Sequence, residues 1–208
     1  MDQRTQRFLE QIQVVPLEVN HLDDLARLHY DMLPWSFNGQ MGPAHIRDLY
    51  SNILNDENVF GSVCYMNNEL MGFLTATMNS KATRQNIQKA YLSKLFKIAW
   101  ALFKSPKTLC IILESKFLVP RIFKQANCEV EWLTFICNTK HSFISPFVAI
   151  KLMSQLNQDL SRRQVKYYMA QGIKDNPPAM KFYKALNWKI AKRLFMHNIY
   201  YFEVKDKP

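Results

Sequence analysis

The sequence predicts an α/β protein in which helices cover both faces of a mixed, mostly antiparallel central sheet. Strand-like and helix-like segments alternate along most of the chain. Two strand-like segments flank Asn67 and Asn68, a pair that tolerates the positive φ of a two-residue hairpin turn. The second half follows a β-α-β order, which predicts that two of its strands pair in parallel. The length of 208 residues fits one domain, residues 1–208.

The first half of the chain is expected to contribute three strands and two helices. Pro16 fits an edge position in the first strand, and Asn20 is a candidate cap for the helix that follows. Pro34 ends that helix, a loop follows, and Pro43 begins the next helix. The expected elements are a strand at 13–19, helices at 20–33 and 43–54, and hairpin strands at 59–66 and 69–78.

A helical insertion, residues 80–127, is expected between the third strand and the fourth. Apolar residues recur at helical spacing from 83 to 104, and Ser105-Pro106 interrupts the pattern. A further helix is expected from 109 to 123.

The positive charge of the chain is concentrated in this insertion. Between Lys81 and Asn127 there are ten Lys or Arg residues and one acid, Glu114, which gives +9. The whole chain carries +10, so the rest of it is nearly neutral. A uniformly basic protein would indicate general nucleic-acid binding, whereas one basic segment indicates a local partner surface.

The second half predicts alternating strands and helices. The segment 129–138 is aromatic and β-branched and gives the clearest strand prediction in the chain. The elements expected after it are a helix from about 146, a strand at 165–170, a helix at 177–187, and strands at 189–195 and 198–204.

Composition and missing motifs exclude several classes of protein. With 13% aromatic residues and 21% charged residues, global disorder is not expected. No apolar run approaches the roughly 20 residues that span a bilayer, and the N-terminus lacks the apolar core of a secretory signal. Four cysteines without CxxC spacing indicate free thiols in a reducing cytosol, so a cytoplasmic protein is expected. No metal-binding, Walker or serine-hydrolase motif occurs, and no metal is expected.

The segment 176–188 (NPPAMKFYKALNW) resembles the N-x-x-A-x-x-F-Y-x-x-L-G-F signature of the GNAT acetyltransferases. Asn187 replaces the helix-ending glycine, and asparagine also adopts the left-handed conformation readily. Trp188 replaces the phenylalanine. The order of elements is also similar, so the resemblance covers about 13–204 apart from the insertion. The residues that match in register are Asn176, Ala179, Phe182, Tyr183 and Leu186.

The resemblance implies a GNAT-like fold and transfer of acetyl from acetyl-CoA to a primary amine by direct attack. Tyr183 would be the general acid that protonates the CoA sulfur, since a phenol can donate to a thiolate. The alternative is that Tyr183 only packs, with its hydroxyl in solvent. Asn176 resembles the residue that hydrogen-bonds the pantetheine arm, and it could equally cap the helix.

The segment 131–137 (EWLTFIC) is similar to the family's E-L-L-x-I-x-V strand, whose backbone runs beside pantetheine. Glu131 would stand where several GNAT enzymes place the carboxylate that accepts the amine proton, because burial raises its pKa toward neutrality. The alternatives are a solvated or salt-bridged Glu131, and Glu129 as a rival base. The cofactor contacts implied on this strand are Phe135, Ile136 and Cys137.

The family's pyrophosphate motif, Q/R-x-x-G-x-G/A, falls on 144–149 (ISPFVA), where only Ala149 matches. Ile144 replaces the basic or amide residue and Phe147 replaces a glycine. A helix N-terminus is still expected there, with Ser145 as its cap and Pro146 at its first position. The loop residues Lys140, His141 and Ser142 could add phosphate contacts. The cofactor-binding residues implied here are Ser145, Phe147, Val148 and Ala149.

Three residues fall where GNAT proteins line the acceptor pocket: His29, Trp35 and Phe37. For His29 the alternative is a structural role, which is common for a single histidine on a helix.

The insertion, together with 36–50, resembles a GNAT subgroup of polysaccharide and sugar biosynthesis, which implies an amino-sugar or nucleotide-sugar acceptor. Its apolar face with flanking lysines also suits an anionic membrane surface through 84–124, a lid over the acceptor, or a homodimer contact. The plain alternative is an amphipathic helix packed on the domain.

The leading hypothesis for the whole chain is an N-acetyltransferase of a small-molecule amine that binds no nucleic acid. The alternatives are a non-catalytic GNAT-fold binding module and a membrane-surface protein.

Overall fold

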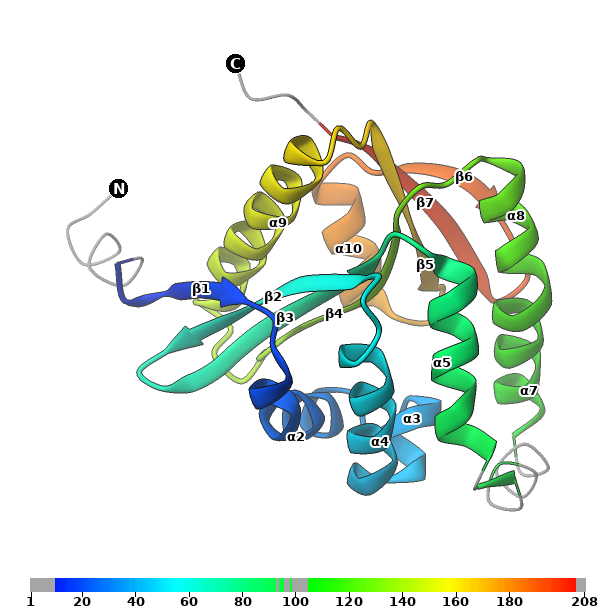
Figure 1. The fold of residues 1–208 in the computed structure, drawn as a ribbon, viewed down its shortest axis with the longest axis horizontal. Coiled ribbons are helices and arrows are strands. Elements are labelled where there is room, and N and C mark those ends of the chain that lie inside the picture. Colours follow the sequence, from blue (N-terminus) through cyan, green and yellow to red (C-terminus); the bar gives the residue numbers. More distant parts are fainter. Residues whose placement is uncertain (1–9, 93, 96–97, 99–104, 205–208) are drawn as a thin grey trace.

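The computed structural model describes residues 10–92, 94–95, 98 and 105–204, and its centre is a seven-stranded sheet (Figure 1). The strands follow the order β1-β2-β3-β4-β5-β7-β6 across the sheet. Among the strands of the described residues, only β4 and β5 pair in parallel, and every other neighbouring pair is antiparallel. The mixed sheet expected from the sequence is confirmed. The strands are β1 (Gln13–Pro16), β2 (Val59–Met66), β3 (Glu69–Thr77), β4 (Glu131–Cys137), β5 (Tyr167–Ile173), β6 (Lys189–Arg193) and β7 (His197–Glu203).

Helices cover both faces of the sheet, as expected. In Figure 1, α9 and α10 lie on one side and α2, α4 and α5 on the other. The helices before the insertion are η1 (Val19–His21), α2 (Leu22–Met32), α3 (Phe37–Met41) and α4 (Pro43–Leu54). The helices after it are α9 (Ser145–Arg162) and α10 (Pro177–Ala185).

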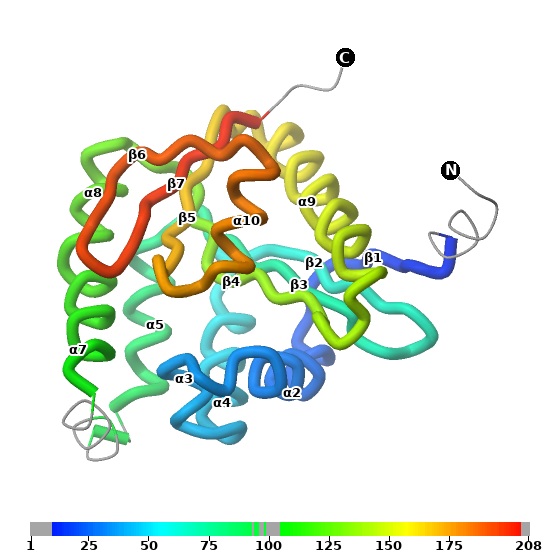
Figure 2. Tube along the Cα trace, turned by 180° about the vertical axis from the view of Figure 1, so that it is seen from behind, coloured from blue at the N-terminus to red at the C-terminus, as the bar shows by residue number. Residues whose placement is uncertain are grey.

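The insertion lies between β3 and β4, which end and begin at Thr77 and Glu131. Its helices stand at the end of the sheet formed by β5, β7 and β6 (Figures 1 and 2). The single helix expected at 109–123 is three consecutive segments, because a π-helical turn interrupts it. Most of the expected helix beyond 92 falls outside the described residues. The described segments are α5 (Ser80–Leu92), α7 (Pro106–Leu113), η2 (Glu114–Leu118, the π-helical turn) and α8 (Val119–Gln125).

Three hydrophobic clusters hold these layers together. The first packs α9 and α10 on one face of the sheet, around buried residues such as Trp132 and Leu152. The second packs α2 and α4 on the other face, around Leu25 and Phe73. The third joins α8 of the insertion to β5 and β7 through Phe123 and nearby side chains. Because the insertion has its own buried contact with the sheet, it is part of the fold rather than a detached loop.

Asparagines form the turns where the sequence predicts them. Asn67 and Asn68 adopt φ values of 51° and 63°, which are those of the expected hairpin turn between β2 and β3. Asn187 adopts φ 56° at the end of α10, where the signature has glycine. The sequence interpretation of all three residues is confirmed.

Several local predictions were wrong. The first strand ends at Pro16, and Asn20 lies inside the short helix η1 instead of capping α2. The loop expected from 34 to 42 contains α3, whose cap is the Ser36 hydroxyl that accepts from the Gly39 N–H at 3.0 Å. Among the described residues, no helix is long and apolar enough to span a bilayer.

Candidate active site

The two parallel strands separate at one point in the middle of the sheet. They pair only at Glu131 with Met169 and Trp132 with Ala170. Beyond this point β4 stays paired with β3 and β5 stays paired with β7 (Figure 1). A bulge in β4 sits at the same place, because the register with β3 shifts between Thr75 and Ala76. Backbone groups that leave a ladder need other hydrogen-bond partners, so this opening is a candidate binding slot.

Tyr183 belongs to α10, which lies beside β4 and β5 (Figure 2). Its ring lies 4.4 Å from that of Tyr200 and meets Trp132 edge-on at 6.3 Å. It also lies against Gly172 of β5, where an added Cβ would come within 2.9 Å of the ring. Burial raises the pKa of Tyr183 well above its ordinary value, and the Tyr200 hydroxyl adds to this. The phenol is therefore protonated at neutral pH.

The hydroxyl of Tyr183 makes no hydrogen bond to any residue in the described part of the chain. Its neighbour Tyr200 donates instead to Met180 and receives a hydrogen bond from Asn198. A phenol held by its ring and with a free hydroxyl can donate to a bound ligand. The role expected for Tyr183 stays a prediction.

Phe135 and Phe182 close the α10 side of the opening. Phe135 comes from β4 and Phe182 from α10, and their rings stack at 4.9 Å with planes 19° apart. Both are only partly buried. A ligand that follows the β4 backbone would therefore run beside this aromatic pair.

The other two residues expected on β4 pack their side chains into hydrophobic clusters, and Cys137 is only partly buried. Ile136 is buried against the α2–α4 cluster. Burial raises the pKa of the Cys137 thiol to about 12, so it stays protonated and is a weak nucleophile. At position 136 only the backbone could serve a cofactor.

Asn176 caps α10. Its side-chain oxygen accepts a hydrogen bond from the Ala179 N–H at 3.3 Å. The capping alternative is therefore confirmed, and the amide NH2 group is left as a possible donor to pantetheine.

Glu131 is engaged in a buried ion pair. It is 2% exposed, and Arg84 of α5 donates to it at 2.5 Å. The Ser80 hydroxyl donates to its other oxygen. Burial raises the pKa of Glu131, although Arg84 and Ser80 oppose the rise. The rival Glu129 is exposed ahead of β4. The salt-bridged alternative matches the geometry, and the role of Glu131 as a base stays a prediction.

The N-terminus of α9 uses its own backbone donors. The N–H of Ser145 bonds to the His141 carbonyl at 3.0 Å, and the N–H groups of Phe147 and Val148 bond to the Ile144 carbonyl. The expectation that Ser145 caps this helix was wrong. The helix begins at Ser145 after Ile144, and the Ser145 hydroxyl donates back to the Asn138 carbonyl at 2.8 Å.

The side chains expected to bind pyrophosphate mostly face inward. Val148 is fully buried in the cluster under α9, and Ala149 is 5% exposed. Phe147 is partly buried against the same cluster. These positions support the helix, and their binding role stays a prediction.

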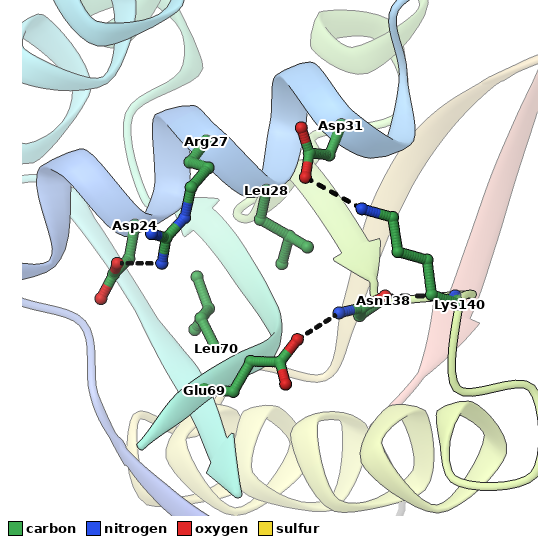
Figure 3. A pocket seen from close by; sticks show the side chains of 8 residues that line it. All are labelled: Asp24, Arg27, Leu28, Asp31, Glu69, Leu70, Asn138 and Lys140. Atoms are coloured by element: carbon green, nitrogen blue, oxygen red, sulfur yellow. Dashed lines mark hydrogen bonds and ion pairs between the residues drawn. The ribbon is translucent and has the colours of Figure 1, made fainter. Parts of the chain in front are cut away.

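Basic residues of the β4–α9 loop are paired with acids. Lys140 bonds to Asp31 at 3.2 Å, and His141 lies 3.6 Å from Glu69. Lys140 and Glu69 also line a cavity of about 270 Å³ beneath α2 (Figure 3). The cavity contains both charge signs, since Asp24 and Arg27 pair there at 2.8 Å. These exposed pairs are weak, so an incoming phosphate could replace the carboxylates.

The three residues expected in an acceptor pocket do not meet at one point. His29 is buried, and its Nδ1 lies 2.8 Å from the Tyr50 hydroxyl. Trp35 is 49% exposed in the turn after α2. Phe37 begins α3 and stacks on Tyr91 of the insertion at 6.1 Å. The acceptor role of all three residues stays a prediction.

Two polar residues of the insertion, Glu114 and Ser115, reach the sheet beside the opening, and the sequence patterns did not predict a site there. Glu114 bonds to His197 of β7, and Ser115 bonds to Gln171 of β5 at 3.1 Å. Arg84, which holds Glu131, also donates to the Ser115 carbonyl at 2.9 Å. The one available signal was that Glu114 is the single acid in a segment with ten basic residues.

Comparison with solved structures identifies the fold. The chain is similar to the PaiA N-acetyltransferase from Thermoplasma acidophilum in complex with coenzyme A, with a TM-score of 0.58 and 12% identity over 92% of this chain and 98% of that one. It is similar to Arabidopsis thaliana NAA60 in complex with acetyl-CoA, with a TM-score of 0.54 and 15% identity over 93% and 98%. It is also similar to aminoglycoside 6'-acetyltransferase type Ii, with a TM-score of 0.58 and 11% identity over 94% and 99%.

No protein-family model matches the sequence, and no curated protein matches it. The structural likeness at these identities establishes the fold alone, which is that of the GNAT acetyltransferases.

Proposed function

We propose that the chain is an N-acyltransferase that moves the acetyl group of acetyl-CoA to a primary amine by direct attack. One observation carries the proposal: β4 and β5 separate beside the protonated phenol of Tyr183. A slot between two parallel strands suits an extended thioester arm, because backbone groups that leave the ladder can hydrogen-bond its amides. The fold shared with proteins solved with coenzyme A and acetyl-CoA supports the same cosubstrate.

Tyr183 is the proposed general acid. The amine nitrogen attacks the thioester carbonyl carbon, the C–S bond breaks, and the Tyr183 hydroxyl gives its proton to the departing sulfur. The phenol regains a proton from the nitrogen, which must lose one to become an amide. A raised pKa supports this role because it keeps the donor protonated over the physiological range.

The β4 backbone at Phe135, Ile136 and Cys137 would hold the pantetheine arm, with the free amide NH2 of Asn176 as a further donor. The pyrophosphate of the cofactor would bind less firmly than in a glycine-rich loop. Because the first N–H groups of α9 already bond within their own turn, phosphate oxygens would depend on Lys140 and His141. We therefore expect weaker cofactor binding than a glycine-rich cradle would give.

Glu131 is the base that the sequence predicts. Its burial favours a raised pKa, which a base near neutrality needs, but the hydrogen bonds to Arg84 and Ser80 occupy both of its oxygens. To accept a proton it would have to release one of these partners. The base role is therefore the least supported of the proposed roles.

The acceptor is proposed to be a primary amine of a small molecule. The similar structures carry names with different acceptors, an aminoglycoside in one case and the alanine of ribosomal protein S18 in another, so the fold does not select among them. An amino sugar or nucleotide-sugar follows only from the resemblance of the insertion to a sugar-biosynthesis subgroup.

Thermal unfolding in the presence of acetyl-CoA tests the proposal. A ligand that binds only the folded state raises the melting temperature as its concentration passes Kd, with about 2.7 kcal/mol of stabilisation at one hundred times Kd. Saturable stabilisation by acetyl-CoA and CoA, but not by adenosine 3',5'-bisphosphate at the same concentration, is expected if the arm lies between β4 and β5. The absence of stabilisation at millimolar acetyl-CoA would favour a non-catalytic binding module.

A further inference from the structure

A buried carboxylate, an imidazole and a hydroxyl are aligned at the junction of the insertion and the sheet. Glu114 Oε2 lies 2.9 Å from His197 Nδ1, and His197 Nε2 lies 3.3 Å from Ser115 Oγ. Glu114 is 7% exposed and His197 is 2% exposed, whereas Ser115 is only partly buried. A hydroxyl in contact with a base that is oriented by a carboxylate is the arrangement that activates hydroxyl groups in enzymes.

The hydrogen bonds determine which atoms carry protons. Glu114 also accepts the backbone N–H groups of Met196 at 3.0 Å and His197 at 3.1 Å. Burial alone would raise the pKa of Glu114, but the hydrogen bonds from His197 and Met196 lower it below its ordinary value. Glu114 is therefore a carboxylate, and His197 donates to it from Nδ1. In the neutral imidazole this leaves the lone pair of Nε2 facing Ser115 Oγ at 3.3 Å. The Ser115 hydroxyl donates its proton to Gln171 Oε1 at 3.1 Å, so it must turn from Gln171 to His197 before the relay can operate.

Ser115 and Tyr183 lie on opposite faces of the same short stretch of β5, residues 169–172. Met169 packs against α8 of the insertion, and Ala170 packs in the cluster under α10. Because side chains alternate, Gln171 returns to the insertion face, where it bonds to Ser115, and position 172 faces Tyr183. Ala170 is the last β5 residue paired with β4. A ligand in the opening would thus meet Tyr183 from one face and Ser115 from the other.

We propose that Ser115, His197 and Glu114 form the proton relay that deprotonates the acceptor amine. The inference rests on the proposed acetyl transfer. An N–H bond of the acceptor ammonium breaks and its proton passes to Ser115 Oγ, while the Ser115 proton passes to His197 Nε2. Glu114 stabilises the resulting imidazolium. The neutral amine then attacks the thioester, its second proton reaches the CoA sulfur by way of Tyr183, and His197 returns its proton to solvent.

The relay accounts for two further features of the structure, the contacts of Arg84 and the π-helical turn at Ser115. Arg84 joins the Glu131 carboxylate to the Ser115 carbonyl, so Glu131 supports the segment that carries Ser115 instead of taking the proton itself. Ser115 stands in η2, a π-helical turn, and such turns occur frequently at functional sites. The insertion would then complete the acceptor side of the site.

Amine basicity provides the first test. CoA release from acetyl-CoA is measured at pH 7.5 with ethylamine and with 2,2,2-trifluoroethylamine, which is largely neutral at that pH and needs no base. For Ser115→Ala and His197→Gln we expect kcat/KM to fall about 100-fold with ethylamine and less than about threefold with the fluorinated amine. Equal losses with both amines would show a structural role and overturn the relay.

A second measurement needs neither cofactor nor acceptor, so it separates failure of the relay from failure of the proposed function. A fluorophosphonate probe is expected to label Ser115, detected by peptide mass spectrometry, at least tenfold faster in the wild-type chain than in His197→Gln. Ser80, which bonds to Glu131 and not to a histidine, is the internal comparison. Labelling of Ser115 that does not depend on His197 would overturn the relay. So would an acetyl group retained on Ser115 after incubation with acetyl-CoA alone, since that would mean covalent transfer.

Discussion

Tyr183 and Gly172 are in such close contact that no side chain fits between them. A Cβ at position 172 would lie 2.9 Å from Cε2 of Tyr183 and 3.0 Å from Cε2 of Tyr200. Glycine is needed here for its small size, because it lets the phenol reach β5 at the point where β4 and β5 part.

Gly172→Ala should therefore displace the Tyr183 ring from the opening. We expect kcat for CoA release to fall by about tenfold or more, and the free energy of unfolding to fall by about 1–3 kcal/mol from overpacking. Steady-state kinetics and urea denaturation measure the two effects. A variant with wild-type kcat would mean that the position of the ring does not matter for turnover.

Removal of the Tyr183 hydroxyl tests the general acid directly. Tyr183→Phe keeps the ring contacts with Trp132 and Tyr200, and no described residue loses a hydrogen bond. We expect kcat to fall about 100-fold, with the KM for acetyl-CoA and the melting temperature nearly unchanged. A kcat within twofold of the wild-type value would remove Tyr183 from the mechanism.

Glu131→Gln distinguishes a base from a counterion. The variant leaves Arg84 without its buried partner, and breaking one side of a buried ion pair costs about 3–5 kcal/mol. We expect that loss in urea denaturation, whereas Glu129→Gln, an exposed carboxylate two positions earlier, should cost less than about 0.5 kcal/mol.

A double variant of Glu131 and Arg84 separates the role of Glu131 as a base from its role as a counterion. If Glu131 only holds Arg84, the double variant Glu131→Gln, Arg84→Met should regain most of the lost stability. It should regain only part of the lost turnover, because it also lacks the hydrogen bond from Arg84 to the Ser115 carbonyl. If Glu131 takes the amine proton, the double variant stays inactive, and the relay through His197 is not the main route.

The parts of the fold that could be predicted from sequence are those that local residue chemistry determines. Asn67, Asn68 and Asn187 adopt the left-handed conformations expected of them because their preference depends on their own backbone. The same holds for the helix at 177–187, where Asn176 caps the first turn. The order of elements along the chain followed from these local patterns, and the β-α-β pattern gave the parallel pair of strands.

The contacts that the sequence could not reveal join residues far apart in the chain. His197 is 83 positions from Glu114, and Arg84 is 47 positions from Glu131. One sequence carries no information on such pairs unless a motif marks them. The start of α9 was mispredicted for another reason. The sequence shows that the glycines of the family's motif are missing, but it does not show that carbonyls of the turn from His141 to Ile144 accept hydrogen bonds from the first N–H groups of α9.

The histidine expected in the acceptor pocket should make the protein sensitive to acid. Burial lowers the pKa of His29 to about 4, and nearby His45 contributes. Because the folded pKa is below the unfolded value of about 6.5, this stability is present above pH 6.5 and is lost as the pH falls toward 4. At pH 5 the loss for His29 is about 2 kcal/mol.

His29→Gln removes the titration and can keep the hydrogen bond to Tyr50. We expect the difference in unfolding free energy between pH 7 and pH 5 to shrink by about 2 kcal/mol in this variant. An unchanged acid sensitivity in His29→Gln would mean that His29 is not buried in the neutral form.

The insertion offers a surface on which the predicted membrane contact can be tested. Leu113 and Phe117 are 45% and 50% exposed and stand four positions apart, and Lys116 lies beside the Phe117 ring at 5.6 Å. Exposed apolar side chains with a neighbouring cation suit the boundary of an anionic bilayer, where buried apolar area and charge both contribute to binding.

If the contact exists, the protein should sediment with phosphatidylserine-containing vesicles and not with phosphatidylcholine alone. Leu113→Ser with Phe117→Ser should reduce the bound fraction several-fold, whereas Phe143→Ser, 64% exposed outside the insertion, should not. Equal sedimentation of both variants would mean that this face does not meet the membrane, and its apolar residues would then have to be explained by a protein partner.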